Sequence, residues 1–277
     1  MRTIQMSSYT VGEDCFEAIP AVLAPYQAKT VVLVGGRRAL AAAAPGIRAA
    51  LDSANVQILD EIVYGTDSTQ SAIDALVASR AFRDADIAFA IGGGKAVDTV
   101  KTAAKELDKT VFSVPTICSN CSSATAIAVV YNDDHSLKGY AYPDAPAHIF
   151  INPAIIAAAP EEYFWAGIGD ALSKQPEVEY ATSEAELTHT GTLGLTLAHT
   201  CTDPLMPTAS RAWPTSASAS RVKRCAKSRS TSWSTRGMSP TSPTSPTSTI
   251  TPHLRTPSTT PRRACSAPGA RTCTERS

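Results

Sequence analysis

Short apolar runs alternate with amphipathic stretches over the first part of the chain. Runs rich in β-branched residues and bounded by turn residues predict buried strands at 30–36, 56–64, 85–94 and 110–116. Apolar residues near a 3.6-residue spacing predict the intervening helices, at 38–54, 68–82 and 95–107. Pro45 lies inside the first of these helices, where it is expected to form a break or a first turn. The alternation favours a parallel, doubly wound α/β sheet whose faces are covered by helices.

The pattern changes further along the chain. Residues 123–133 and 147–153 keep an extended character, whereas residues 160–205 are helical in pattern without a strand candidate. Hydrophobic periodicity disappears after Met206. We therefore predict an α/β domain over 1–159, the truncated start of an all-helical domain over 160–206, and a low-complexity Ser/Thr/Pro tail over 207–277 that is disordered.

Charge is divided unevenly between these parts. Asp and Glu are common up to Met206, but Glu275 is the only acidic residue after Pro207, where Arg and Lys recur. A basic tail of this kind is typical of segments that bind nucleic acid or membranes. Trp213 and Trp233 are its only large aromatic residues and no recognised module is present, so nucleic acid is not expected as a partner.

Neither a targeting segment nor a membrane span is expected. The first fifteen residues lack an apolar core, and the apolar run 149–169 is interrupted by Pro153, Pro160 and a pair of glutamates. The seven cysteines are odd in number and scattered, which favours free thiols over a disulfide framework. We expect a cytoplasmic protein without a membrane partner.

Three consecutive glycines, 92–94, separate a predicted strand from a predicted helix. Glycines at such a turn let the backbone approach a phosphate, and the helix N-terminus supplies free N–H groups and a positive dipole end. This is the usual place for a dinucleotide pyrophosphate in an open α/β sheet. A tight turn without a ligand explains the glycines equally well, and their spacing is not that of the GxGxxG fingerprint.

Three motifs occur in a family-like order: AIGGGKAVDTVKTAA, VPTICSNCSSATAIAVVYND and AGIGDALSK. From Met1 to about Leu205 the chain resembles the iron-containing alcohol dehydrogenase superfamily, most nearly its glycerol dehydrogenase branch, whose fold is shared with dehydroquinate synthase. The resemblance implies NAD or NADP in the N-terminal domain, zinc or iron facing the helical domain, and hydride transfer from a small alcohol or polyol such as glycerol to the nicotinamide. It also implies a homo-oligomer, although we do not expect a chain that lacks most of the helical domain to assemble.

The resemblance also assigns residues. Asp170 matches the metal-binding carboxylate, and Cys121 lies at the substrate-contacting position. Asp98 and Lys101 complete the GGGxxxDxxK signature, where packing or solvation explains them as well as ligand binding does. The positions that match cofactor-binding residues are Gly93, Gly94, Lys95, Thr116, Ser119, Thr125, Ile127 and Tyr131.

Two positions depart from the family. Cys121 replaces an aspartate, and a thiol is a poorer acceptor than a carboxylate for two polyol hydroxyls, which weakens the case for glycerol. Gly36 and Arg37 stand where an NAD-selective member carries an acidic residue for the ribose hydroxyls. Arg37 and Arg38 could accommodate a 2′-phosphate, as in NADP, or be solvated turn residues.

The metal site is incomplete in this sequence. A catalytic metal of this kind needs three protein ligands, and the family supplies one aspartate and two histidines. None of the five histidines has a family-like context, so Asp170 lacks partners and little or no dehydrogenase activity is expected. The histidines are His135, His148, His189, His199 and His253.

A shift of reading frame accounts for both the tail and the missing histidines. If each new codon takes the third base of one codon and the first two bases of the next, the segment from Pro207 can encode AHGVEGLADVRERVARQA, an amphipathic helix. Later segments can encode HAFYN, whose histidine overlays Thr256, and HLHGE, whose histidine before the glycine overlays Thr274. We hypothesise a frameshift near Met206 and Pro207, so that residues 207–277 are an out-of-frame translation.

Two other functions stay open at this stage. One is a nucleotide-binding module whose basic tail engages nucleic acid. The other is a relative of glycerol-1-phosphate dehydrogenase or dehydroquinate synthase, although the loop 114–133 is closer to the glycerol dehydrogenase pattern.

Overall fold

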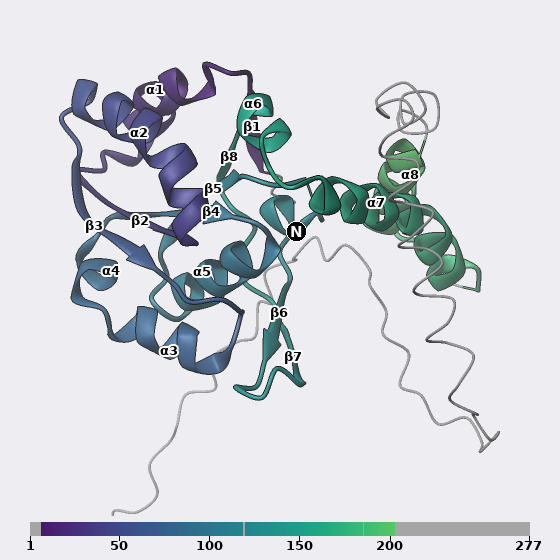
Figure 1. Cartoon of the computed structure of the whole chain (residues 1–277). Coiled ribbons are helices and arrows are strands. Elements are labelled where there is room, and N and C mark those ends of the chain that lie inside the picture. Colours follow the sequence, from purple (N-terminus) through teal and green to yellow (C-terminus); the bar gives the residue numbers. More distant parts are fainter. Residues whose placement is uncertain (1–6, 119, 185, 203–277) are drawn as a thin grey trace, which may run out of the picture.

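The computed structural model describes residues 7–118, 120–184 and 186–202 (Figure 1). Six strands form one sheet in the order β1-β8-β5-β4-β2-β3, and every neighbouring pair in it is parallel. These strands are β1 (Ser8–Val11), β2 (Thr30–Gly35), β3 (Gln57–Val63), β4 (Ile87–Gly92), β5 (Thr110–Pro115) and β8 (His148–Ile151). The predicted parallel α/β sheet is therefore confirmed.

Helices accompany the sheet, and one hairpin stands apart from it. The hairpin is antiparallel and consists of β6 (Ala128–Tyr131) and β7 (Leu137–Ala141). The helices are α1 (Ile19–Leu23), α2 (Arg37–Ser53), α3 (Gln70–Ala78), α4 (Arg80–Asp84), α5 (Gly94–Glu106), α6 (Pro153–Ala157), α7 (Glu161–Thr182) and α8 (His189–Thr202). Among the described residues, none of these helices is long and apolar enough to cross a membrane.

The sheet divides the core into two apolar layers. Val31 and Leu33 of β2 pack with α1 and α2 on one face, while Val32 and Val34 pack with α3, α4 and α5 on the other. Successive residues of a strand point to opposite faces, so a central strand covered on both sides must be apolar throughout. Figure 1 shows α1 and α2 on one side of the sheet and α3, α4 and α5 on the other. This arrangement explains the continuous apolar runs of β2 and β4.

The structure corrects two details of the predicted helices. The helix expected at 68–82 is divided at Ser79, which is extended and whose hydroxyl accepts a hydrogen bond from the Phe82 amide at 3.3 Å, capping α4. Pro45 neither breaks α2 nor lies in its first turn: the helix continues through it. Proline has no N–H to donate to the carbonyl one turn earlier. Because Pro45 is exposed, water can hydrogen-bond to that carbonyl instead.

The part of the chain after residue 160 is helical as far as the structure describes it. Helices α7 and α8 pack together beside the sheet, and the described residues of 160–202 contain no strand, as predicted (Figure 1). The tail, 207–277, lies outside the described residues. The predicted disorder of the tail and the boundary at Met206 stay predictions.

The chain reverses direction across the sheet between β2 and β4. From β2 it passes through α2 to β3 at one edge, and from β4 it passes through α5 to β5 on the other side. At this switch point Gly35 lies so close to β4 that a Cβ on it would come within 2.3 Å of the Ile91 carbonyl oxygen. The obstacle is backbone, which cannot move without disturbing the sheet, so this position requires glycine.

We expect Gly35→Ala to lower the free energy of unfolding by about 2 kcal/mol or more, because the new methyl group overpacks the centre of the sheet. The neighbouring Gly36 is the matched control, since its Cβ would meet nothing within 4 Å and its φ is −76°. Gly36→Ala should cost less than about 1 kcal/mol, the loss of a glycine N-cap. Urea unfolding of both variants measures this, and equal losses would contradict the close strand approach.

Candidate cofactor cleft and metal position

A cleft of ≈ 1240 Å³ opens at the carboxyl ends of the sheet strands. It is larger than the roughly 300–1000 Å³ typical of small-molecule pockets, so it suits an extended ligand. The segments after β2, β3, β4 and β5 and the start of α7 line it, through Gly36, Tyr64, Gly93, Thr116 and Tyr163. Ligands of open α/β sheets bind at this edge, beside the switch point.

The glycine turn at the centre of the cleft has two constraints. Gly92 has a φ of +149°, and a Cβ on it would lie 2.8 Å from the Ala96 Cβ, so no other residue fits there. Gly93 is the N-cap of the 13-residue helix α5, and no side chain caps it. The first amides of α5 therefore have no capping side chain, as in a site that receives a phosphate.

Lys95, predicted beside the pyrophosphate, belongs to a charged cluster. Its Nζ donates to Asp67 Oδ2 at 2.8 Å and lies 5.7 Å from the centre of the Tyr131 ring, so two predicted cofactor residues are neighbours. The His135 ring is 3.0 Å from the same Asp67 oxygen. Burial raises the pKa of Asp67, but hydrogen bonds from Lys95, the Ser68 amide and His135 outweigh it and hold the pKa below its usual value.

Lys101 fastens the loop that follows β5 to helix α5. The Lys101 side chain is 0% exposed. Its ammonium donates to three backbone carbonyls of the loop: those of Ser122 at 2.8 Å, Thr125 at 3.0 Å and Ile127 at 2.7 Å. An ammonium has three N–H donors, which is enough for one hydrogen bond to each of these carbonyls. Burial holds the pKa of Lys101 below its usual value, and the charge and hydrogen bonding of Asp98 oppose that shift.

Asp98 completes the attachment from the same helix. One carboxylate oxygen lies 3.2 Å from the Lys101 ammonium and accepts a hydrogen bond of 2.5 Å from the Ser122 hydroxyl. The other oxygen accepts from the Val129 amide at 3.1 Å, at the start of the hairpin. Surface solvation, one of the roles that the sequence allows for Asp98 and Lys101, is therefore wrong, because both residues are buried and hydrogen-bonded.

The loop held by Lys101 carries several of the predicted site residues. Thr125 and Ile127 face Lys101 with their carbonyls, and the Thr125 hydroxyl is buried without a hydrogen-bond partner among the described residues. Thr116 lines the cleft, whereas Ser119 lies outside the described residues.

Asp67 was not identified as a site residue from the sequence, because nothing in its local pattern distinguishes it from an ordinary turn aspartate.

Cys121 and Asp170, the predicted substrate and metal positions, lie close enough to interact electrostatically. Burial raises the pKa of the Cys121 thiol, the Asp170 carboxylate raises it further, and the Lys174 ammonium lowers it. Asp170 itself is 3.3 Å from the Lys174 ammonium. The structure therefore brings together residues that are separated by about fifty positions in the chain.

The described residues do not fit a bound catalytic metal. No group of three or more His, Cys, Asp or Glu side chains is arranged to hold an ion within the part of the chain that the structure describes. His199 lies 3.6 Å from Glu179, and His148 is buried between β1 and β8 with hydrogen bonds to Ser8 and Thr10. Thr256 and Thr274 lie outside the described residues.

Comparisons with known proteins agree with the motifs. Residues 10–160 match the family profile described as "Iron-containing alcohol dehydrogenase". The chain is 31% identical over 188 residues to hydroxycarboxylate dehydrogenase A of Escherichia coli, covering 67% of this chain and 51% of that protein. It is 30% identical over 211 residues to glycerol dehydrogenase of Pseudomonas putida, covering 74% and 57% respectively.

The fold agrees as well. The crystal structure of glycerol dehydrogenase from Schizosaccharomyces pombe superposes with a TM-score of 0.66 at 24% identity, covering 76% of this chain and 54% of that one. The chain thus spans about half the length of the relatives it matches.

We expect Lys101→Met to lower the free energy of unfolding by about 3 kcal/mol or more, because it leaves three carbonyls and the Asp98 carboxylate without their buried cation. Lys29→Met is the control, since Lys29 is exposed and its loss should cost less than about 0.5 kcal/mol. Chemical denaturation measures both. Unchanged stability of the Lys101 variant would contradict the role of Lys101.

Proposed function

Because the chain belongs to the iron-containing alcohol dehydrogenase family, we propose that its α/β part binds a nicotinamide dinucleotide in the cleft at the switch point. The observation that carries this proposal is the α5 N-terminus, which opens into the cleft behind Gly92 and Gly93 without a capping side chain. Its amides and dipole attract a pyrophosphate. NAD or NADP would accept a hydride from the carbon of an alcohol.

The residues of the cleft take separate parts in this proposal. Gly93 and Gly94 allow the pyrophosphate to approach the backbone, and Lys95 adds a positive charge beside it. Thr116, Ser119, Thr125, Ile127 and Tyr131 line the remainder of the cofactor. Lys101 and Asp98 are positioning residues, because they bond to the backbone of the loop that carries several of these side chains.

A small alcohol, polyol or related hydroxy compound is the proposed substrate class. The relatives are named as glycerol and hydroxycarboxylate dehydrogenases, which share a hydroxyl-bearing carbon as the site of hydride loss. Cys121 is proposed to contact the substrate. A thiol accepts hydrogen bonds weakly, so it would hold a pair of adjacent hydroxyls less firmly than a carboxylate would.

Metal-assisted chemistry is not proposed for the described part of the chain. Asp170 is the one residue there that matches a metal ligand, and its carboxylate is paired with Lys174. A single carboxylate does not hold zinc or iron tightly. We propose that the remaining ligands belong to a helical domain that is out of frame after Met206, so that this chain binds cofactor but turns over little or no alcohol.

The full chain is expected to bind NADH or NADPH, seen as a change in nicotinamide fluorescence, yet to show no alcohol oxidation when Zn²⁺ or Fe²⁺ and glycerol are added. Gly93→Asp should weaken binding by about tenfold or more, because it sets a carboxylate against the pyrophosphate. Circular dichroism checks that this variant is folded. Absence of binding would contradict the cofactor proposal, and rapid metal-dependent turnover would contradict the incomplete metal site.

The reading frame has its own decisive test, the DNA sequence of codons 207 to 277. The shifted frame should read as a charged amphipathic helix from Pro207, with histidine codons that overlay Thr256 and Thr274. A protein made in that frame should gain metal-dependent dehydrogenase activity. A shifted frame that contains stop codons or lacks those histidines would overturn the hypothesis.

A further inference from the structure

The end of the cleft next to β2 carries positive charge that no described residue neutralises. Arg37 and Arg38 follow β2 and line the large cleft together with Gly36 and Gly93. Both arginines are exposed, and neither forms an ion pair or hydrogen bond with another described residue. Two guanidinium groups therefore line the cleft without a partner in the part of the chain that the structure describes.

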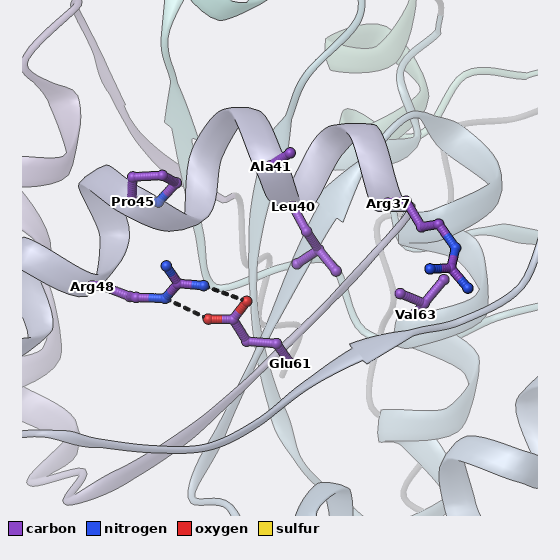
Figure 2. Close-up of a pocket in the computed structure, with 7 residues that line it drawn as sticks. All are labelled: Arg37, Leu40, Ala41, Pro45, Arg48, Glu61 and Val63. Carbon is purple, nitrogen blue, oxygen red and sulfur yellow. Dashed lines mark hydrogen bonds and ion pairs between the residues drawn. The ribbon is translucent and has the colours of Figure 1, made fainter.

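A second, smaller pocket adjoins this end of the cleft. It has a volume of ≈ 350 Å³ and shares Arg37 and Val63 with the large cleft, so the two cavities meet there. Figure 2 shows Arg37 at the start of α2 beside Val63, with Leu40, Ala41, Pro45 and Arg48 further along the helix and Glu61 opposite them on β3. A ligand that runs from Gly93 past β2 would reach this junction.

Each cavity has one acidic residue in its lining, Glu61 in the smaller pocket and Glu13 in the large cleft. Glu61 in the smaller pocket is held by Arg48 through two hydrogen bonds of 2.6 and 2.7 Å, so its charge is neutralised (Figure 2). Glu13 lines the large cleft near β8, where its backbone carbonyl accepts a hydrogen bond from the Asn152 side chain. Strands β5 and β4 separate β8 from β2. No described carboxylate is therefore free at the junction to accept hydrogen bonds from ribose hydroxyls.

The direction of a bound dinucleotide follows from the other end of the site. Cys121 follows β5 in the chain and interacts with Asp170 of α7, and Figure 1 shows α7 on the side of the sheet away from β3. The reactive nicotinamide must face the substrate position, so with the pyrophosphate at the α5 N-terminus the adenosine extends toward β2 and β3. Its ribose then lies by Arg37 and Arg38.

On these grounds, and resting on the proposed cofactor function, we propose that the cleft selects a dinucleotide with a 2′-phosphate, NADP, over NAD. A guanidinium binds a phosphate by charge-assisted, paired hydrogen bonds. NAD selection requires a carboxylate that accepts from the ribose hydroxyls and repels a 2′-phosphate, and this end of the cleft has the opposite charge. Arg37 is the principal residue and Arg38 the second.

The test is equilibrium binding of NADPH and NADH to the full chain, followed by nicotinamide fluorescence. Wild-type protein should bind NADPH about tenfold more tightly than NADH, the effect of roughly 1.4 kcal/mol from charge-assisted contacts. The double variant Arg37→Gln, Arg38→Gln should lose most of this ratio through weaker NADPH binding. Added salt should reduce the NADPH preference of the wild type, since exposed charges are screened.

Arg80→Gln is the control, because it removes one guanidinium group by the same substitution from an exposed site on α4 that lines neither cavity. It should leave the NADPH to NADH ratio unchanged. Equal or tighter binding of NADH by the wild type, or an undiminished ratio in the double variant, would overturn the selection of NADP but leave cofactor binding intact. Failure to bind either dinucleotide would contradict the proposed function itself, together with this inference.

Discussion

A single buried ammonium joins the two structures on which the candidate site depends. Lys101 lies on the helix whose N-terminus opens into the cleft, and its three N–H groups bind the loop that carries Thr125 and Ile127. The desolvation of this charge is large and is offset only when every donor has a partner and Asp98 lies alongside. The interaction therefore tolerates little movement, and the loop keeps a fixed position relative to the glycine turn.

The sequence predicts the sheet because β2 and β4 are covered on both faces and must be apolar throughout. It also places the glycine turn, since the strand and the helix on either side are strongly marked. The attachments of the loop could not be predicted in the same way. They depend on which carbonyls meet Lys101 after folding, and Asp67 joins Lys95 across a gap of 28 positions. The local sequence pattern does not predict such contacts.

The cofactor side of the candidate site has more of the groups it needs than the metal side has. The cofactor side has a cleft, an open helix N-terminus and two guanidinium groups that pair with no described residue, all within well-packed α/β structure. The metal side offers Asp170 on α7, already paired with Lys174, and exposed aromatic residues such as Phe164 and Tyr180 on the same helix. Apolar surface of that kind normally packs against further protein. Under the proposed function, cofactor binding by this chain would therefore not require the metal chemistry.

Hydrogen–deuterium exchange of the full chain, with and without saturating NADPH, tests this account most directly. Binding should slow exchange in the segments that the cleft brings together, the start of α2, the turn from Gly92 to Ala96 and the loop from Thr116 to Tyr131, while α8 remains unchanged. Protection confined to other segments, or saturable binding that leaves the glycine turn unprotected, would contradict the placement of the cofactor at the switch point.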